Sequence, residues 1–127
     1  MKLTPILLFL FFASTNLVAQ ANDSLKAQFL KDWQRAKDYT KSYLDVTPAE
    51  KYSMRPNDSI RSFAEQMLHL AQGNVNLISI ATGKDKIFGT RNLEKEKTTQ
   101  TKDSVTYFVL ASYDYAIEAL KDRKSVV

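Results

Sequence analysis

The fold is decided by the stretch Ser62-Phe63-Ala64-Glu65-Gln66-Met67-Leu68-His69-Leu70-Ala71. Ser62 and Glu65 stand at the offset of a capping box, which predicts the start of a helix. The helix should extend to about Thr82, because Gly83 suits the left-handed residue that ends many helices. Its predicted apolar face comprises Phe63, Met67, Leu70, Leu77, Ile78 and Ala81, widened by Ala71 and Val75.

Two further helices follow from the same spacing of apolar residues. The first covers residues 24–44 behind Asp23 as N-cap, with an apolar side formed by Leu25, Phe29, Trp33, Ala36, Thr40 and Tyr43. We interpret Trp33 as a core residue rather than a ligand-stacking one. The last helix begins near Thr101, with an apolar face of Val105, Phe108, Val109, Ser112, Ala116, Ala119 and Leu120. With only 3 glycines and 3 prolines, the chain is predicted to be all-α.

Two connections join these helices. Thr47-Pro48-Ala49-Glu50 has capping-box spacing and predicts a short helical turn that ends before Pro56. Residues 83–100 are long and charged, with Ile87-Phe88 as their only strong apolar contact. A connection of this length either edges a functional site or is a mobile surface crossover.

Both ends of the chain have features of non-structural segments. Residues 1–21 read as a secretory signal, with Lys2, an apolar run over residues 6–12 and Ala19-Gln20-Ala21. The run is shorter than the roughly 20 residues of a membrane span, although a retained anchor helix is the alternative.

Residues 122–127 match the product of a common sequencing adapter, so we interpret them as a non-native tail; the alternative is a genuine basic tail. This leaves one domain, residues 22–121, exported to the periplasm or secreted, without membrane contact after signal removal.

Composition excludes several classes of function. The chain has no cysteine, which rules out disulfides and a thiol nucleophile. Its net charge of +4 is spread without a basic run, so nucleic acid is not an expected partner. There is no glycine-rich phosphate loop, and a single histidine leaves no ordinary serine triad.

That single histidine, His69, lies in a polar stripe with Glu65, Gln72 and Asn76. The stripe is either a solvated helix face, which periodicity favours, or the wall of a cleft. One imidazole does not hold a divalent metal tightly. Glu65, one turn before His69, and Asp114 are secondary candidate ligands, but helix capping already explains Glu65 and a solvated face explains Asp114.

Four segments together resemble the DinB-like superfamily. They are the first helix with Trp33, the linker Glu50-Lys51-Tyr52-Ser53-Met54-Arg55-Pro56, the stretch 62–71, and Tyr113-Asp114-Tyr115-Ala116-Ile117-Glu118-Ala119-Leu120. The resemblance covers nearly all of the mature chain but only part of a full member. It implies an up-and-down four-helix bundle, of which this chain contains about three helices.

The resemblance also implies an open metal site of three histidines, one on the second helix and two on a later one. His69 matches the first, and no histidine follows it. Imidazoles hold zinc, nickel or iron and leave a position for water. We therefore expect an exported divalent-metal enzyme, a hydrolase or thiol-dependent transferase acting on an unknown small molecule. Its metal site is incomplete here, so this chain should bind no metal tightly.

Two further expectations accompany this interpretation. Three helices that lack a fourth should leave an apolar groove and favour a homodimer. The alternative function is a metal-free helical binding or interaction module, in which His69 is only polar surface.

Overall fold

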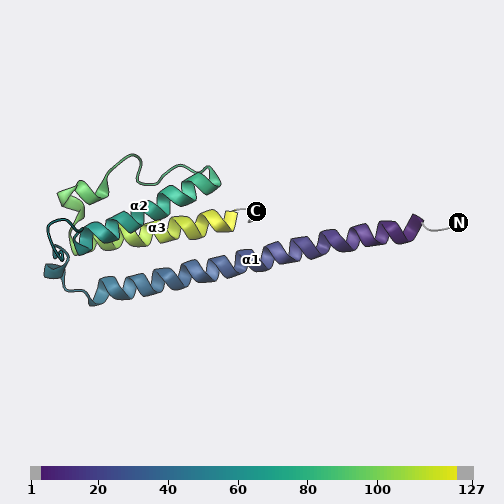
Figure 1. The fold of residues 1–127 in the computed structure, drawn as a ribbon, viewed down its shortest axis with the longest axis horizontal. Helices are drawn as coiled ribbons and strands as arrows, with labels where there is room; N and C mark the ends of the chain where they lie inside the picture. Colours follow the sequence, from purple (N-terminus) through teal and green to yellow (C-terminus); the bar gives the residue numbers. More distant parts are fainter. Residues whose placement is uncertain (1–3, 123–127) are drawn as a thin grey trace.

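The computed structural model describes residues 4–122, with side chains described for residues 23–122. This part of the chain forms three α-helices and no strand: α1 (Thr4–Val46), α2 (Phe63–Thr82) and α3 (Lys102–Asp122) (Figure 1). Short 3-10 turns lie at Ala49–Lys51, Leu93–Lys95 and Lys97–Thr99. The prediction of an all-helical fold is confirmed. A fourth helix is not among the described residues.

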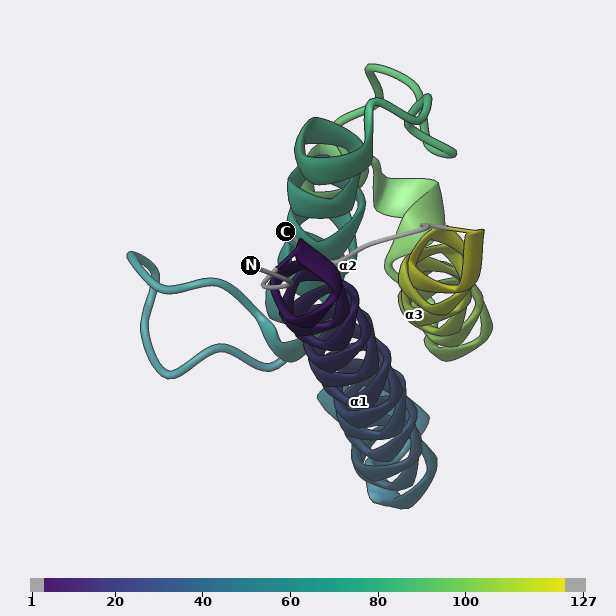
Figure 2. The ribbon, with the colours of Figure 1, turned by 90° about the vertical axis from the view of Figure 1, so that its right-hand side faces the viewer.

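The direction of the helices differs from the expected up-and-down order. α1 is antiparallel to α2, but α3 runs parallel to α2 (Figures 1 and 2). α3 packs against both other helices. The order changes because residues 83–101, here called the crossover, return along the whole length of α2. A 20-residue helix is about 30 Å long, well within the reach of such a segment.

The predicted ends of α2 are confirmed. The Ser62 hydroxyl accepts a hydrogen bond from the backbone N–H of Glu65 (3.2 Å), and the Glu65 carboxylate accepts one from the backbone N–H of Ser62 (2.7 Å). Gly83 takes the left-handed conformation, with φ of 72°. At the start of α3, the Thr101 hydroxyl accepts from the backbone N–H of Ser104. The local signals thus place these helix ends correctly.

α1 departs from its predicted limits and face. It is continuous from Thr4 to Val46, so Asp23 is not an N-cap. Trp33, Ala36 and Thr40 face the other helices as expected, but the rest of the inward side is formed by Leu30, Lys37 and Leu44. Four large side chains instead form an exposed row that flanks the inward side, here called the outer stripe: Leu25, Phe29, Tyr39 and Tyr43. Both rows have helical spacing, and packing against α3 selects the inner one.

The core lies where α2 and α3 meet, and its residues differ in part from those that helix periodicity predicted. Leu77 is 69% exposed and Ala81 is also exposed, which corrects the predicted face of α2. Trp33 packs edge-on against Tyr113, with ring centroids 5.8 Å apart, as expected of a core residue. The main cluster of buried side chains comprises Leu44, Tyr52, Ala64, Leu68, Ala71, Leu93, Val105, Val109 and Tyr113.

The linker forms its predicted short turn but not the predicted capping box. The turn at Ala49–Lys51 has no side-chain cap. The Thr47 hydroxyl instead donates to the carbonyl of Tyr43 (2.7 Å), a carbonyl near the end of α1. The nearby Tyr52 side chain is buried and its hydroxyl donates to the carbonyl of Leu44 (2.9 Å).

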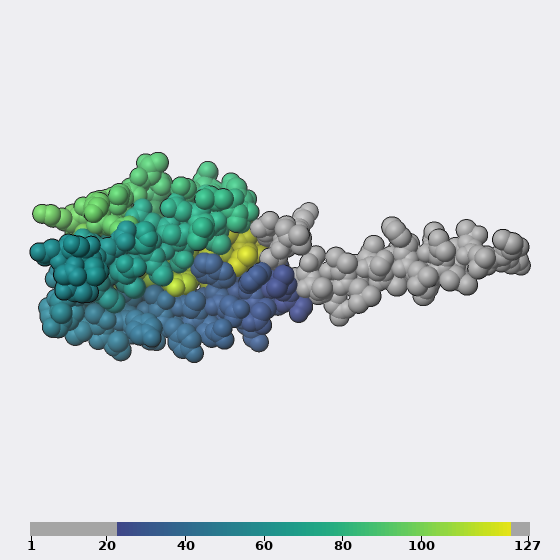
Figure 3. Space-filling model, in the orientation of Figure 1, coloured from purple at the N-terminus to yellow at the C-terminus, as the bar shows by residue number. Residues whose placement is uncertain are grey.

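The crossover is fixed along α2 on the side away from α1 (Figure 3). Leu93 is fully buried in the core. Phe88 packs edge-on against Phe108, whereas Ile87 is exposed. The principal apolar anchor is thus Leu93 and not Ile87, and the crossover is packed against the polar stripe of α2.

No helix in the described part of the chain is long and apolar enough to cross a membrane. The expected signal, residues 1–21, lies outside the residues whose side chains are described. Residue 122 ends α3, where Asp122 pairs with Lys84, while residues 123–127 of the expected tail lie outside the described part.

Candidate functional site

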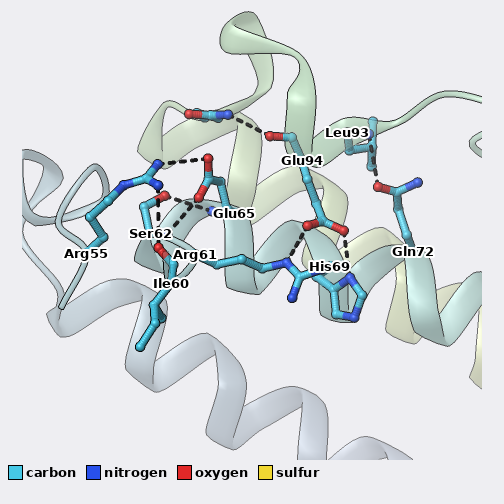
Figure 4. Close-up of polar contacts among 10 residues, drawn as sticks. Arg55, Ile60, Arg61, Ser62, Glu65, His69, Gln72, Leu93 and Glu94 are labelled. Atoms are coloured by element: carbon cyan, nitrogen blue, oxygen red, sulfur yellow. Dashed lines mark hydrogen bonds and ion pairs between the residues drawn. The ribbon is translucent and has the colours of Figure 1, made fainter. Parts of the chain in front are cut away.

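His69 projects from the middle of α2 and is half-exposed. Its Nδ1 atom lies 2.6 Å from Oε1 of Glu94 on the crossover (Figure 4). Its Nε2 atom has no hydrogen-bond partner among the residues whose side chains are described. One edge of the imidazole is thus fixed and the other is available.

Glu94 is held firmly from the opposite side. Its side chain is 14% exposed, and Nε of Arg61 donates to its Oε2 over 2.5 Å (Figure 4). Its backbone carbonyl accepts from the Gln100 amide (2.8 Å). Burial raises the pKa of Glu94, but hydrogen bonds from Arg61 and His69 outweigh it, so the pKa lies below 4.5. The side chain is therefore a carboxylate at neutral pH.

This chain of contacts sets the chemistry of the imidazole. A carboxylate only accepts hydrogen bonds, so Nδ1 of His69 must carry the proton that it donates to Glu94. When the ring is neutral, Nε2 consequently has a bare lone pair. Metal-ligating histidines in proteins are commonly oriented by a carboxylate in the same way.

Gln72 positions the crossover next to His69. Its amide donates to the carbonyl of Arg91 (2.8 Å). Its oxygen accepts from the backbone N–H of Leu93 (2.9 Å), as Figure 4 shows. A polar hollow of about 370 Å³ lies between this part of α2 and the crossover, and Asn76 also lines it. His69, Gln72 and Asn76 of the polar stripe therefore line a cleft, whereas Glu65 lies outside it.

The secondary candidates are engaged elsewhere. Glu65 caps α2 and forms an ion pair with Arg55 (3.0 Å). The hydrogen bond from the backbone of Ser62 is the main reason that the pKa of Glu65 lies below 4.5; burial opposes this effect and Arg55 adds to it. Asp114 pairs across the helix interface with Lys37 of α1 (2.5 Å). Neither forms a hydrogen bond or ion pair with His69 among the residues whose side chains are described.

A complete metal site is not formed by residues 4–122. No group of three or more histidine, aspartate or glutamate side chains in the described part is placed to hold a metal ion. His69 fits the role of one ligand, since its Nε2 is bare and its ring is oriented.

Sequence reasoning found His69 but missed Glu94 and Arg61. Both lie in stretches that read as solvated connections, and Glu94 is 25 positions from His69 along the chain. The available signal was Leu93, the one large apolar residue in the polar stretch 89–101, whose burial brings Glu94 over α2. Comparison with protein-family models, curated proteins and solved structures gives no match for this chain.

Proposed function

We propose that this chain is the helical scaffold of an exported DinB-like protein, in which His69 is one ligand of a divalent metal in an enzyme site. The observation that carries the proposal is the hydrogen bond between Nδ1 of His69 and Glu94, which leaves Nε2 bare and oriented. A histidine that only decorated a solvated surface would not need a buried carboxylate, itself held by Arg61, to fix its ring.

The metal in the complete protein is zinc, nickel or iron, the divalent ions that neutral imidazole suits. Its remaining ligands come from residues outside the range 4–122. When bound, such a cation acts as a Lewis acid and lowers the pKa of a coordinated water. The reaction is accordingly that of a hydrolase or a thiol-dependent transferase. The hollow beside His69 has room for a small polar substrate, lined by Gln72 and Asn76.

Metal content of the protein with its natural C-terminus tests this proposal. The wild-type protein should contain one equivalent of metal by mass spectrometry, and His69→Ala should lose it. Glu94→Gln should weaken metal affinity by about 10- to 100-fold, because Glu94 orients the ligand. The matched control is Glu65→Gln, which removes a carboxylate one turn away from His69 and should retain the metal.

The coding sequence downstream of Leu120 provides a second test of the proposal. A coding sequence that continues past Leu120 with two histidines one turn apart on an amphipathic helix supports the proposal. A natural stop after Val127 would overturn it. The 127-residue chain alone should hold no stoichiometric metal. Stoichiometric metal that is bound to this chain and lost in His69→Ala would contradict the proposal that the remaining ligands lie outside residues 4–122.

One observation favours the second candidate, a metal-free interaction module. The outer stripe of α1 exposes four large side chains in a row, as a helix that meets another protein surface does. If this is the function, His69→Ala leaves partner binding unchanged and Tyr43→Glu abolishes it. Equal effects of the two substitutions would exclude the module.

A further inference from the structure

A second concave surface lies at the start of α2, beside the linker. Met54 and Ile60 of the linker are about half-exposed, and together with Pro56 and Phe63 they line a mostly apolar hollow of about 450 Å³. Figure 4 shows the Ile60 side chain pointing away from the neighbouring ion pairs. Apolar side chains in a concave surface of this size are typical of a ligand site.

A polar hollow of about 560 Å³ adjoins it. The two hollows adjoin, because both are lined by Ile60, Arg61 and Gln66, and together they are here called the groove. The polar end also includes Lys95 and Asn92 from the crossover. The groove therefore has an apolar half on the linker side and a polar half on the crossover side.

The polar half has an excess of positive charge. Arg61 donates only its Nε–H to Glu94, and its other N–H groups have no partner among the residues whose side chains are described. Lys95 forms no ion pair within the same residues. Arg55 of the apolar half is paired with Glu65 (3.0 Å), and Lys95 also lies close enough to Glu65 to lower its pKa. Three cations, Arg55, Arg61 and Lys95, therefore face two carboxylates, Glu65 and Glu94, which leaves one net positive charge beside the apolar half.

From this arrangement we propose that the groove binds an amphiphilic anion. The apolar body of the ligand lies against Met54, Ile60 and Phe63, and its anionic head contacts Lys95 and the free edge of Arg61. A neutral apolar ligand would leave both cations unused, and a small inorganic anion would leave the apolar half empty. The proposal goes beyond the metal site and does not require it, since His69 does not line this groove.

Two fluorescent probes with the same aromatic rings test the proposal. 8-Anilinonaphthalene-1-sulfonate has an anionic group, whereas N-phenyl-1-naphthylamine has none. The wild-type chain should bind the sulfonate saturably at one site, about tenfold more tightly than the neutral probe. Ile60→Asp should weaken both probes about tenfold or more. Lys95→Gln should weaken only the sulfonate, and decanoate should displace it.

Matched controls identify the site. Ile80→Asp removes an apolar side chain that is 80% exposed near the other end of α2, and Lys97→Gln removes an exposed cation two residues from Lys95. Neither should change the binding of either probe, and circular dichroism should show that all variants fold. His69→Ala should also leave probe binding unchanged, which separates this proposal from that of the metal. Equal affinity for the two probes, or equal losses in Ile60→Asp and Ile80→Asp, would overturn the inference.

Discussion

Glu94 is the residue on which the geometry of the site depends. It lies between Arg61 and His69, accepts a hydrogen bond from each, and is mostly buried. Its position could not be predicted from the sequence, because helix periodicity does not report on a contact from a 3-10 turn to a helix. His69 could be selected because it is the only histidine in the chain. Composition thus singled out His69 as the candidate, and only the fold identified what orients its ring.

The lowered pKa of Glu94 gives a prediction at this scale. The folded state binds a proton at Glu94 less readily than the unfolded state, in which the Glu94 carboxyl has its ordinary pKa of 4.5. Its stabilising contribution is therefore complete above that value and is lost as pH falls through the lower folded pKa. Glu94→Gln should reduce the free energy of unfolding at pH 7 by about 1 kcal/mol, a low value because Arg61 and His69 are half-exposed.

Urea unfolding between pH 7 and pH 3 measures this effect. The wild-type protein and Glu94→Gln should differ at pH 7, and the difference should shrink as the pH approaches 3. A difference that stays constant across this range would show that the charge of Glu94 is not what stabilises the contact.

The ends of α2 were predictable because the signals are local. Ser62, Glu65 and Gly83 act through their own backbone, and all three do so as the sequence indicated. The face of α1 was not predictable, because it has two rows of large side chains at helical spacing. Only the surface of α3 decides between them, and that surface is not encoded within α1.

Gly73 within α2 and Gly83 at its C-terminal end should respond in opposite directions to the same substitution. An added Cβ meets nothing within 4 Å at either Gly73 or Gly83, so only backbone preference matters. Gly83→Ala should destabilise by about 1 kcal/mol, because φ is 72°. Gly73→Ala, within the helix, should stabilise by roughly 0.5–1 kcal/mol. Chemical denaturation measures both, and a shift of the same sign in the two variants would contradict the assigned conformations.

The parallel direction of α2 and α3 is a property of the whole molecule. The expectation of alternating directions treated residues 83–101 as a simple connection, whereas buried Leu93 and Thr99 fix this crossover along the helices. The all-helical class and the approximate limits of α2 and α3 followed from the sequence pattern, whereas the start of α1 did not. Direction and packing order depend on contacts between segments far apart in the sequence, which one sequence does not display.

Self-association is predicted at the same scale. The outer stripe of α1 exposes Leu25, Phe29, Tyr39 and Tyr43 in one row, and covering it in a homodimer removes apolar surface from water. Sedimentation velocity should show a concentration-dependent dimer. Tyr43→Glu should be monomeric, whereas Tyr107→Glu, at an equally exposed tyrosine on α3, should still dimerise. A monomer at all concentrations would count against this surface as an interface.

The central claim is that Glu94 fixes the ring of His69 and leaves Nε2 bare. Long-range ¹H–¹⁵N NMR correlation of the imidazole tests it most directly, at a pH where the ring is neutral. The account predicts the tautomer protonated at Nδ1 in the wild-type protein, and a changed tautomer population in Glu94→Gln. A ring protonated mainly at Nε2 in the wild-type protein would contradict the account.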